Sequence, residues 1–169
     1  MATDLKTTID LTVKAVERET GVGVGSTSSQ IVHQIAAALS FANGTSASQM
    51  DVIHSGSLSI SGASTLDCRG GLSSVLTGDA INFVEITWIV LYNKSSTSGE
   101  YITVGAGSNP VTSLWGASGD AIVVGPGGLL VIGSPIDGYG TTAGTADIVT
   151  ITPATGTISV DYILIGRSA

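Results

Sequence analysis

From about residue 51 onward, glycine-rich turns divide the chain into short segments in which apolar residues alternate with polar ones. An alternation with a period of two gives a strand one core face and one solvent face. About eight such segments follow at a spacing near ten to twelve residues, as in β-sandwiches. No 3.6-period run after residue 50 is long enough for a helical crossover between parallel strands. We therefore predict an all-β fold, a two-sheet antiparallel sandwich that is jelly-roll-like.

The segment 84–93, VEITWIVLYN, is the strongest strand candidate because apolar residues occupy both of its faces. A strand of this kind belongs in the centre of a sheet. The turn chemistry predicts two hairpins. One joins this strand to the segment 100–107, and the other spans 147–166 with the Pro153–Gly156 turn at its tip.

The N-terminal region has a different pattern. Ile9, Leu11 and Val13 alternate with polar residues, and a glycine- and serine-rich stretch follows. We predict an extended N-terminal arm with its linker at 1–28 and a sandwich domain at 29–169. Since an arm strand can add to the sheet edge of a neighbouring copy, the three apolar residues are candidate assembly contacts.

The segment SQIVHQIAAALSFANG has two interpretations. A short helix over 29–42 would begin at Ser29 and present Ile31, Ile35 and Leu39 on one face. A strand is the alternative, because Ile31 and the residue after it are β-branched.

Charge is scarce in this sequence. Only 11% of residues are charged, and 6 basic residues against 13 acidic ones give a formal net charge of −7. This balance argues against nucleic acid and anionic membrane surfaces as partners. Two interpretations of the low charge stand: a low-charge secreted or viral β-domain, or a surface that contacts copies of itself or a larger lattice. The N-terminus lacks the apolar region of a secretory signal, which predicts synthesis and assembly in a cytoplasm.

Reactive side chains form no recognisable motif. Cys68 is expected to be a buried structural thiol. His33 and His54 stand in no metal-binding pattern, and the scattered loop aspartates, among them Asp120, Asp137 and Asp147, match no calcium loop. We predict no catalytic residues, no cofactor and no metal.

Two aromatic residues fall in predicted loops. Trp115 and Tyr139 are candidate contact residues, although Trp115 could instead be the lid of the core. Exposed aromatic rings could stack on sugars, which makes a glycan-binding module a possible function.

The order of motifs over residues 39–169 resembles small virion-associated proteins of tailed bacteriophages. The opening LSFANGTSASQMDVIHSGSLSISGASTLDCRGGL is followed by an aliphatic strand, a VGAGSN hairpin, a PGG turn, a TAGTAD loop and the strand YILIGRS. Cys68 departs from the pattern, where an aliphatic residue is usual, and residues 1–28 lie outside it. The resemblance implies a virion component, assembled in the host bacterial cytoplasm, and a role as a head decoration or cement protein.

The sequence is compatible with three functions. The first is a non-enzymatic cement protein that binds the major capsid protein or other virion proteins as a homotrimer. The second is a tail, neck or fibre protein with a host-glycan-binding sandwich. The third, a jelly-roll hydrolase or lyase, rests on fold analogy and would need His33 or His54 beside two carboxylates.

Overall fold

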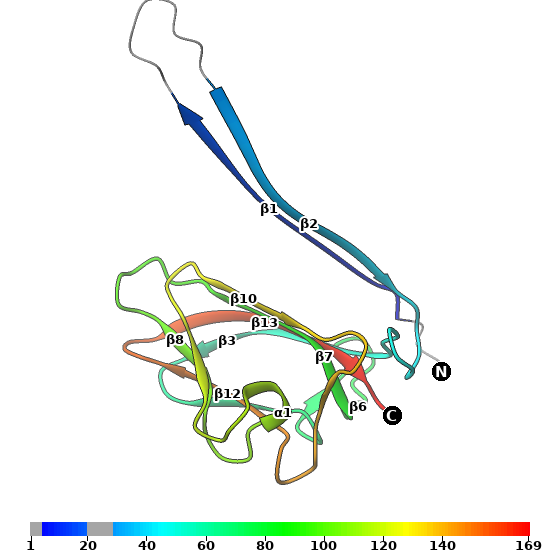
Figure 1. The fold of residues 1–169 in the computed structure, drawn as a ribbon. Helices are drawn as coiled ribbons and strands as arrows, with labels where there is room; N and C mark the ends of the chain where they lie inside the picture. Colours follow the sequence, from blue (N-terminus) through cyan, green and yellow to red (C-terminus); the bar gives the residue numbers. More distant parts are fainter. Residues whose placement is uncertain (1–4, 20–28) are drawn as a thin grey trace, which may run out of the picture. The chain divides into compact units, whose positions relative to one another are not determined.

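The computed structural model describes residues 5–19 and 29–169, and nearly all of its regular structure is β (Figure 1). The all-β prediction is confirmed. The chain divides into two compact units. One unit contains residues 42–169 together with Leu5, and the other is Lys6–Phe41.

The larger unit is a sandwich of two antiparallel sheets. The first sheet has the order β10-β7-β13-β3, and β11 also pairs with β7. The second has the order β4-β12-β8-β9. The strands of the first sheet are β3 (Val52–Ile60), β7 (Glu85–Asn93), β10 (Leu129–Gly133), β11 (Tyr139–Gly140) and β13 (Ile158–Arg167). Those of the second are β4 (Ser64–Asp67), β8 (Ile102–Gly105), β9 (Ala121–Val124) and β12 (Ile148–Pro153).

Three short elements complete this unit. Strands β5 (Leu72–Ser73) and β6 (Ala80–Ile81) pair with each other, and Leu72 and Ile81 join the main core. The single helical turn α1 (Thr112–Trp115) lies between β8 and β9 in the chain. No helix in the described residues is long and apolar enough to cross a bilayer.

The central position of the 84–93 strand is confirmed, because β7 is bonded to β10 and β11 on one side and β13 on the other. Strand β13 is also central, between β7 and β3. The two predicted hairpins are wrong. Strand β8 pairs with β12 and β9, not with β7, and β12 and β13 belong to different sheets. Both connections cross the sandwich, and a local turn signal cannot distinguish a hairpin from such a crossing.

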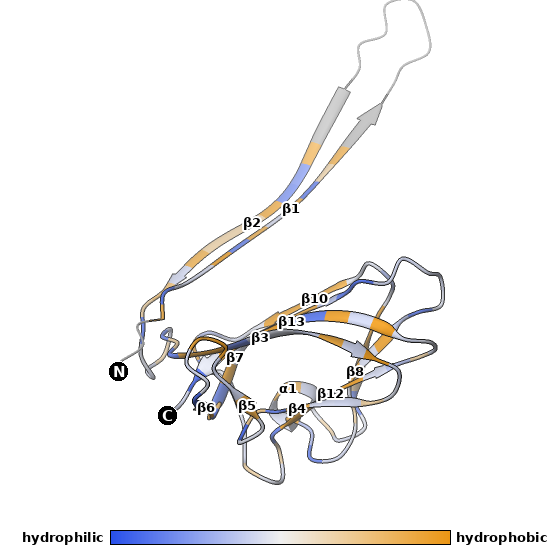
Figure 2. Ribbon diagram, turned by 180° about the vertical axis from the view of Figure 1, so that it is seen from behind, coloured by the Kyte–Doolittle hydropathy of each residue, from blue (hydrophilic) through white to orange (hydrophobic). Residues whose placement is uncertain are grey.

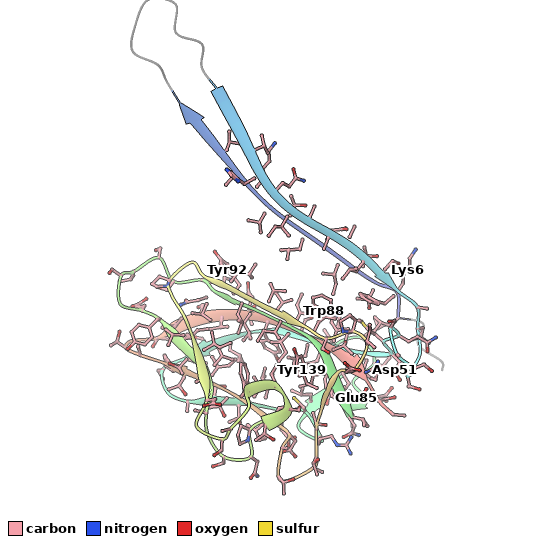
Figure 3. All side chains as sticks on the ribbon, in the orientation of Figure 1. Lys6, Asp51, Glu85, Trp88, Tyr92 and Tyr139 are labelled. Carbon is pink, nitrogen blue, oxygen red and sulfur yellow. The ribbon has the colours of Figure 1, made fainter. Side chains whose placement is uncertain are left out.

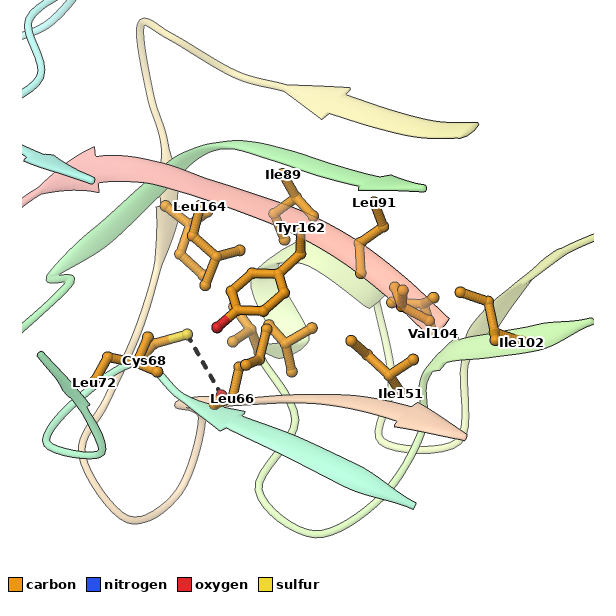
Figure 4. Packing of buried hydrophobic residues seen from close by; sticks show 14 of the residues in the cluster. Leu66, Cys68, Leu72, Ile89, Leu91, Ile102, Val104, Ile151, Tyr162 and Leu164 are labelled. Carbon is orange, nitrogen blue, oxygen red and sulfur yellow. Dashed lines mark hydrogen bonds between the residues drawn. The ribbon is translucent and has the colours of Figure 1, made fainter. Parts of the chain in front are cut away.

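The core lies between the two sheets (Figure 4). Inward residues of β7 and β13, such as Ile89 and Leu164, are fully buried, as are Val104 and Ile151 of the opposite sheet. Burying an aliphatic side chain of this size contributes roughly 1.5–3 kcal/mol. Alternation in the sequence therefore becomes two apolar layers that pack face to face.

Two aromatic rings in the first sheet lie against glycines on neighbouring strands. Trp88 is paired with Gly133, and a Cβ at Gly133 would lie 2.2 Å from the Trp88 Cζ3 atom. Tyr162 is paired with Gly56, where a Cβ would lie 2.9 Å from the Tyr162 hydroxyl. Each glycine leaves room for a ring to lie flat across the neighbouring strand.

A buried arginine joins four segments of the sandwich. Arg167 is 2% exposed, and its Nε and Nη2 atoms each lie 2.5 Å from a Glu85 carboxylate oxygen. Its guanidinium also donates to the carbonyls of Ser46, Pro135 and Ile136 at 3.2–3.3 Å. This fork of donors ties the end of β13 to the start of β7 and to two loops.

The smaller unit is a two-stranded antiparallel ribbon, made of β1 (Thr7–Glu19) and β2 (Ser29–Phe41). Each strand is 13 residues long, and the register pairs Thr7 with Phe41 and Glu19 with Ser29. The strand predicted in the arm is present. The glycine- and serine-rich linker lies almost wholly outside the described residues.

The possible helix at 29–42 is not formed, and the strand alternative is correct. The reason is that β2 completes its backbone hydrogen bonds on β1, and its β-branched residues suit a strand. The arm strand is therefore paired within its own chain rather than on a neighbour. The boundary between the units lies after Phe41, not after residue 28 as predicted.

Candidate interaction surfaces

The ribbon has one apolar face, which we call the ribbon face. Directly opposed residues in an antiparallel pair share a face, so the register assigns its members. In the four rows from Ile9 to Ala15, the members are Ile9, Leu11, Val13, Ala15, Ile35, Ala37 and Leu39, with His33 as the one polar member, opposite Ala15. Leu11 is 37% exposed, Val13 58% and Ile35 72%. All three predicted arm contacts, Ile9, Leu11 and Val13, therefore lie together on this face. Figure 2 shows the corresponding change between hydrophobic and hydrophilic residues along β1.

The opposite face of the ribbon is polar or small over most of its length. It contains Thr8, Asp10, Thr12, Lys14, Gln34, Ala36, Ala38 and Ser40, with Val16 and Val32 at the far end. An isolated two-stranded ribbon is marginally stable in water. One apolar face and one polar face are typical of a strand pair that packs against another surface on its apolar side only.

The first sheet of the sandwich has a second apolar surface, which we call the outer sheet face. The pairings place it on the side of the sheet away from the core, in three rows across the strands. The first row is Leu129 and Tyr92, followed by the polar residues Asp161 and Ser57, the second is Val131, Val90 and Ile163, and the third is Trp88, Ile165 and Ile53.

Much of the outer sheet face is open. Leu129 is 57% exposed, Tyr92 41%, Ile53 40% and Ile163 37%, while Trp88 is half-buried (Figure 3). A contiguous exposed apolar patch on a soluble domain marks an interaction site more often than chance exposure does.

The first row of this face ends in polar residues on β13 and β3. Asp161 accepts a hydrogen bond from the Ser57 hydroxyl and forms an ion pair with Lys94 at 3.2 Å. The hydrogen bond from Ser57 and the contact with Lys94 lower the pKa of Asp161. The carboxylate is therefore neutralised locally, so it does not oppose contact with another apolar surface.

The two aromatic loop candidates are not exposed contacts. Trp115 ends α1, is only 8% exposed and belongs to the core, so the lid interpretation is correct. Its indole Nε1 is buried without a hydrogen-bond partner. Tyr139 begins β11, opposite Ile86, and is half-buried against the core. Trp115 therefore presents no open face of the kind that sugar stacking needs.

The two histidines lie in different units. His54 Nδ1 is 2.9 Å from the Ser73 carbonyl oxygen, and its Nε2 is 2.9 Å from the Tyr162 hydroxyl. His33 lies on β2, in the other unit. No carboxylate is among the hydrogen-bond partners found for His54, and no group of three metal-ligating side chains occurs in the described part of the chain.

The remaining candidates have structural surroundings. Asp120 and Asp147 accept backbone N–H bonds within their own turns, at 2.9 Å from Ala117 and 2.5 Å from Gly144. Asp137 is exposed in the loop before β11. Cys68 is fully buried, as predicted, and burial raises the pKa of its thiol to about 12.

One open hollow of about 170 Å³ lies beside β6. Two carboxylates line it, Asp51 and Asp79, and Asp51 accepts bonds from the backbone N–H and the hydroxyl of Ser168. This pairing engages Asp51 in holding the chain after β13.

Sequence reasoning did not identify the outer sheet face. The signal was present, because β7 is apolar on both sides, but it indicated only a central strand. A central position between hydrogen-bonded neighbours does not require a cover on both faces.

No family model matches the chain, and no curated protein matches it.

Proposed function

We propose that this chain is a non-enzymatic structural component of a tailed-phage particle, a head decoration or cement protein that acts as a homo-oligomer. The observation that carries the proposal is the amphipathic ribbon attached to a sandwich with its own exposed apolar face. Two open apolar surfaces on a charge-poor chain favour assembly into a larger structure. The motif order over residues 39–169 supports the choice of a phage virion.

A cement role uses these features in a simple way. An oligomer that contacts several capsid subunits at once gains avidity, because each added contact is intramolecular after the first. A trimer would suit a site between shell subunits related by threefold symmetry. The sandwich supplies a rigid body, and the ribbon supplies surface for contact with a neighbour.

The test is the stoichiometry of the chain in intact particles, measured by quantitative mass spectrometry against the major capsid protein. A ratio near one, or a simple fraction such as a third, is expected for a shell-wide cement protein. A handful to a few dozen copies per particle would refute that role and favour a neck, tail or fibre position.

Binding to the shell can be measured directly as well. The purified full chain should co-sediment with empty shells that lack it, and should raise their resistance to heat or chelators. A chain that stays in the supernatant at micromolar concentration would contradict the proposal.

The glycan-binding alternative loses one of its two candidate aromatic rings, because Trp115 is buried in the core. It would now depend on rings of other loops or of the outer sheet face, such as Tyr92. The particle stoichiometry separates the two functions.

A further inference from the structure

We propose that the ribbon face of one copy packs on the outer sheet face of a second copy of this chain, in an exchange of ribbons that closes as a reciprocal pair or as a ring of three. The inference deepens the proposed function and rests on its oligomeric part. It names the surfaces that hold the oligomer together.

The two faces match in chemistry. The ribbon rows from Ile9 to Val13 contain no charged residue, and the one carboxylate in the rows of the sheet face, Asp161, is paired with Lys94. Most residues of both faces are aliphatic or aromatic, and both faces stand on antiparallel strands. Packing these rows on each other would bury apolar side chains from both faces, while Asp161 keeps its partner.

The two faces also match in spacing. On the ribbon, the rows are Ile9 with Leu39, Leu11 with Ala37, and Val13 with Ile35. On the sheet, the three rows cross β7 at Tyr92, Val90 and Trp88. Rows on any pleated strand pair repeat every two residues, about 6.8 Å, so the side chains can interdigitate as in a sandwich core.

The buried area indicates how many contacts an assembly needs. Nine residues of ribbon, about 30 Å long and about 10 Å wide, give roughly 300 Å² per face. One contact then buries roughly 600 Å² in total, below the roughly 1,000 Å² of a specific interface. Two reciprocal contacts bury about 1,200 Å², and a ring of three buries about 1,800 Å².

The ribbon is long enough to cover the whole sheet face of a second copy. At 13 residues, each ribbon strand is about 43 Å long, while β7 and β13 have 9 and 10 residues and are about 30–33 Å long. The ribbon therefore exceeds the sheet face it would cover. Exchange of an identical element between copies is a low-cost route to a closed oligomer.

The first test is the mass of the full chain in solution, by size exclusion with light scattering. Wild-type protein is expected to be a dimer or trimer, and Ile35→Glu, which places a charge on the ribbon face, is expected to be monomeric. Gln34→Glu places the same charge on the opposite face and should keep the wild-type mass. A monomeric wild type, or equal masses for the two variants, would overturn the proposal.

The second test is chemical cross-linking, which detects the contact itself and does not require a variant that breaks the oligomer. Val13→Cys and Leu129→Cys are prepared as separate chains, unfolded and refolded together, and treated with a short bis-maleimide. Cys68 is fully buried, so it should not react with the maleimide in the folded protein. A covalent pair between the two chains is expected, and Thr12→Cys, on the other side of the ribbon, should give much less.

A single chain with both Val13→Cys and Leu129→Cys tests the competing arrangement, in which each ribbon covers the sheet of its own chain. Cross-links confined to a single chain, with none in the mixture, would mean that each ribbon covers its own sheet and would refute the exchange. The proposed function has a separate readout. A monomer that still co-sediments with shells would reject only the exchange, and an exchanged oligomer that never binds shells would reject only the cement role.

Discussion

The Arg167–Glu85 pair offers the sharpest test of what holds the sandwich together. Arg167→Met keeps most of the apolar stem and removes every charged donor. Glu85 loses its partner, and three loop carbonyls lose theirs. Breaking a buried pair from one side costs about 3–5 kcal/mol. The Glu85 side chain is 32% exposed and can recover some hydration, so we expect the lower end, about 3 kcal/mol.

A loss of this size should lower Tm by roughly 6–12 °C for a chain of this length. The assay is thermal and urea unfolding followed by tryptophan fluorescence, because Trp88 and Trp115 both lie in the sandwich. Lys94→Met is the matched control, since it removes one partner of an exposed ion pair whose side chains are 44% and 42% exposed. Solvent screening should leave its midpoint nearly unchanged.

Arg167→Lys tests the geometry of the pair rather than its charge. A lysine keeps one positive charge but cannot reach Glu85 and the carbonyls with a planar fork. It should fall between wild type and Arg167→Met. The reasoning is refuted if Arg167→Met lowers the midpoint no more than Lys94→Met does.

Three further predictions follow from the core and the outer sheet face. Leu164→Ala, at a fully buried position, should destabilise the sandwich by about 2–5 kcal/mol in urea titrations, while Ser159→Ala on the exposed side of the same strand should change little. Burial, with smaller contributions from Asp67 and Asp147, raises the pKa of Cys68 from 9.0 to about 12, so the folded thiol stays neutral where the unfolded one ionises. The contribution of the neutral thiol to the free energy of unfolding should therefore be fully present below pH 9, and that free energy should fall by about 1.4 kcal/mol per pH unit between pH 9 and 12. Cys68→Ala should flatten this slope in urea titrations at different pH values. Equal slopes for the wild type and the variant would contradict the argument. Gly133→Ala should displace the Trp88 ring and shift its emission to longer wavelength, whereas Gly140→Ala, whose added Cβ meets nothing within 4 Å, should not.

Local periodicity predicted the strands well because it is a property of neighbouring residues. It left the segment 29–41 ambiguous for a specific reason. Ile31, Ile35 and Leu39 are spaced by four, and a spacing of four keeps residues on one side of a helix and also on one side of a strand. Only the pairing with β1 decides between them, and that partner is distant in sequence.

Sheet membership was harder to predict than strand position. The turn at Pro153–Gly156 has hairpin chemistry, yet it carries the chain from one sheet to the other. Which sheet a strand joins depends on the order in which all strands pack, and no local window contains that information. Trp115 shows the same limit, because its loop-like neighbours do not reveal that the ring is in the core.

The place of β13 has a consequence for how the protein is made. Among the strands of the first sheet it comes last in the chain, yet it lies in the middle, and β3 is bonded to it along nine residue pairs. During synthesis β3 leaves the ribosome first, and its partner strand β13 is made about a hundred residues later. Completion of the first sheet must therefore follow translation of this region, with a slow rate set by distant pairings. Until then the edges of β3 and β7 are open, and crowded expression at high temperature is the condition under which aggregates should form.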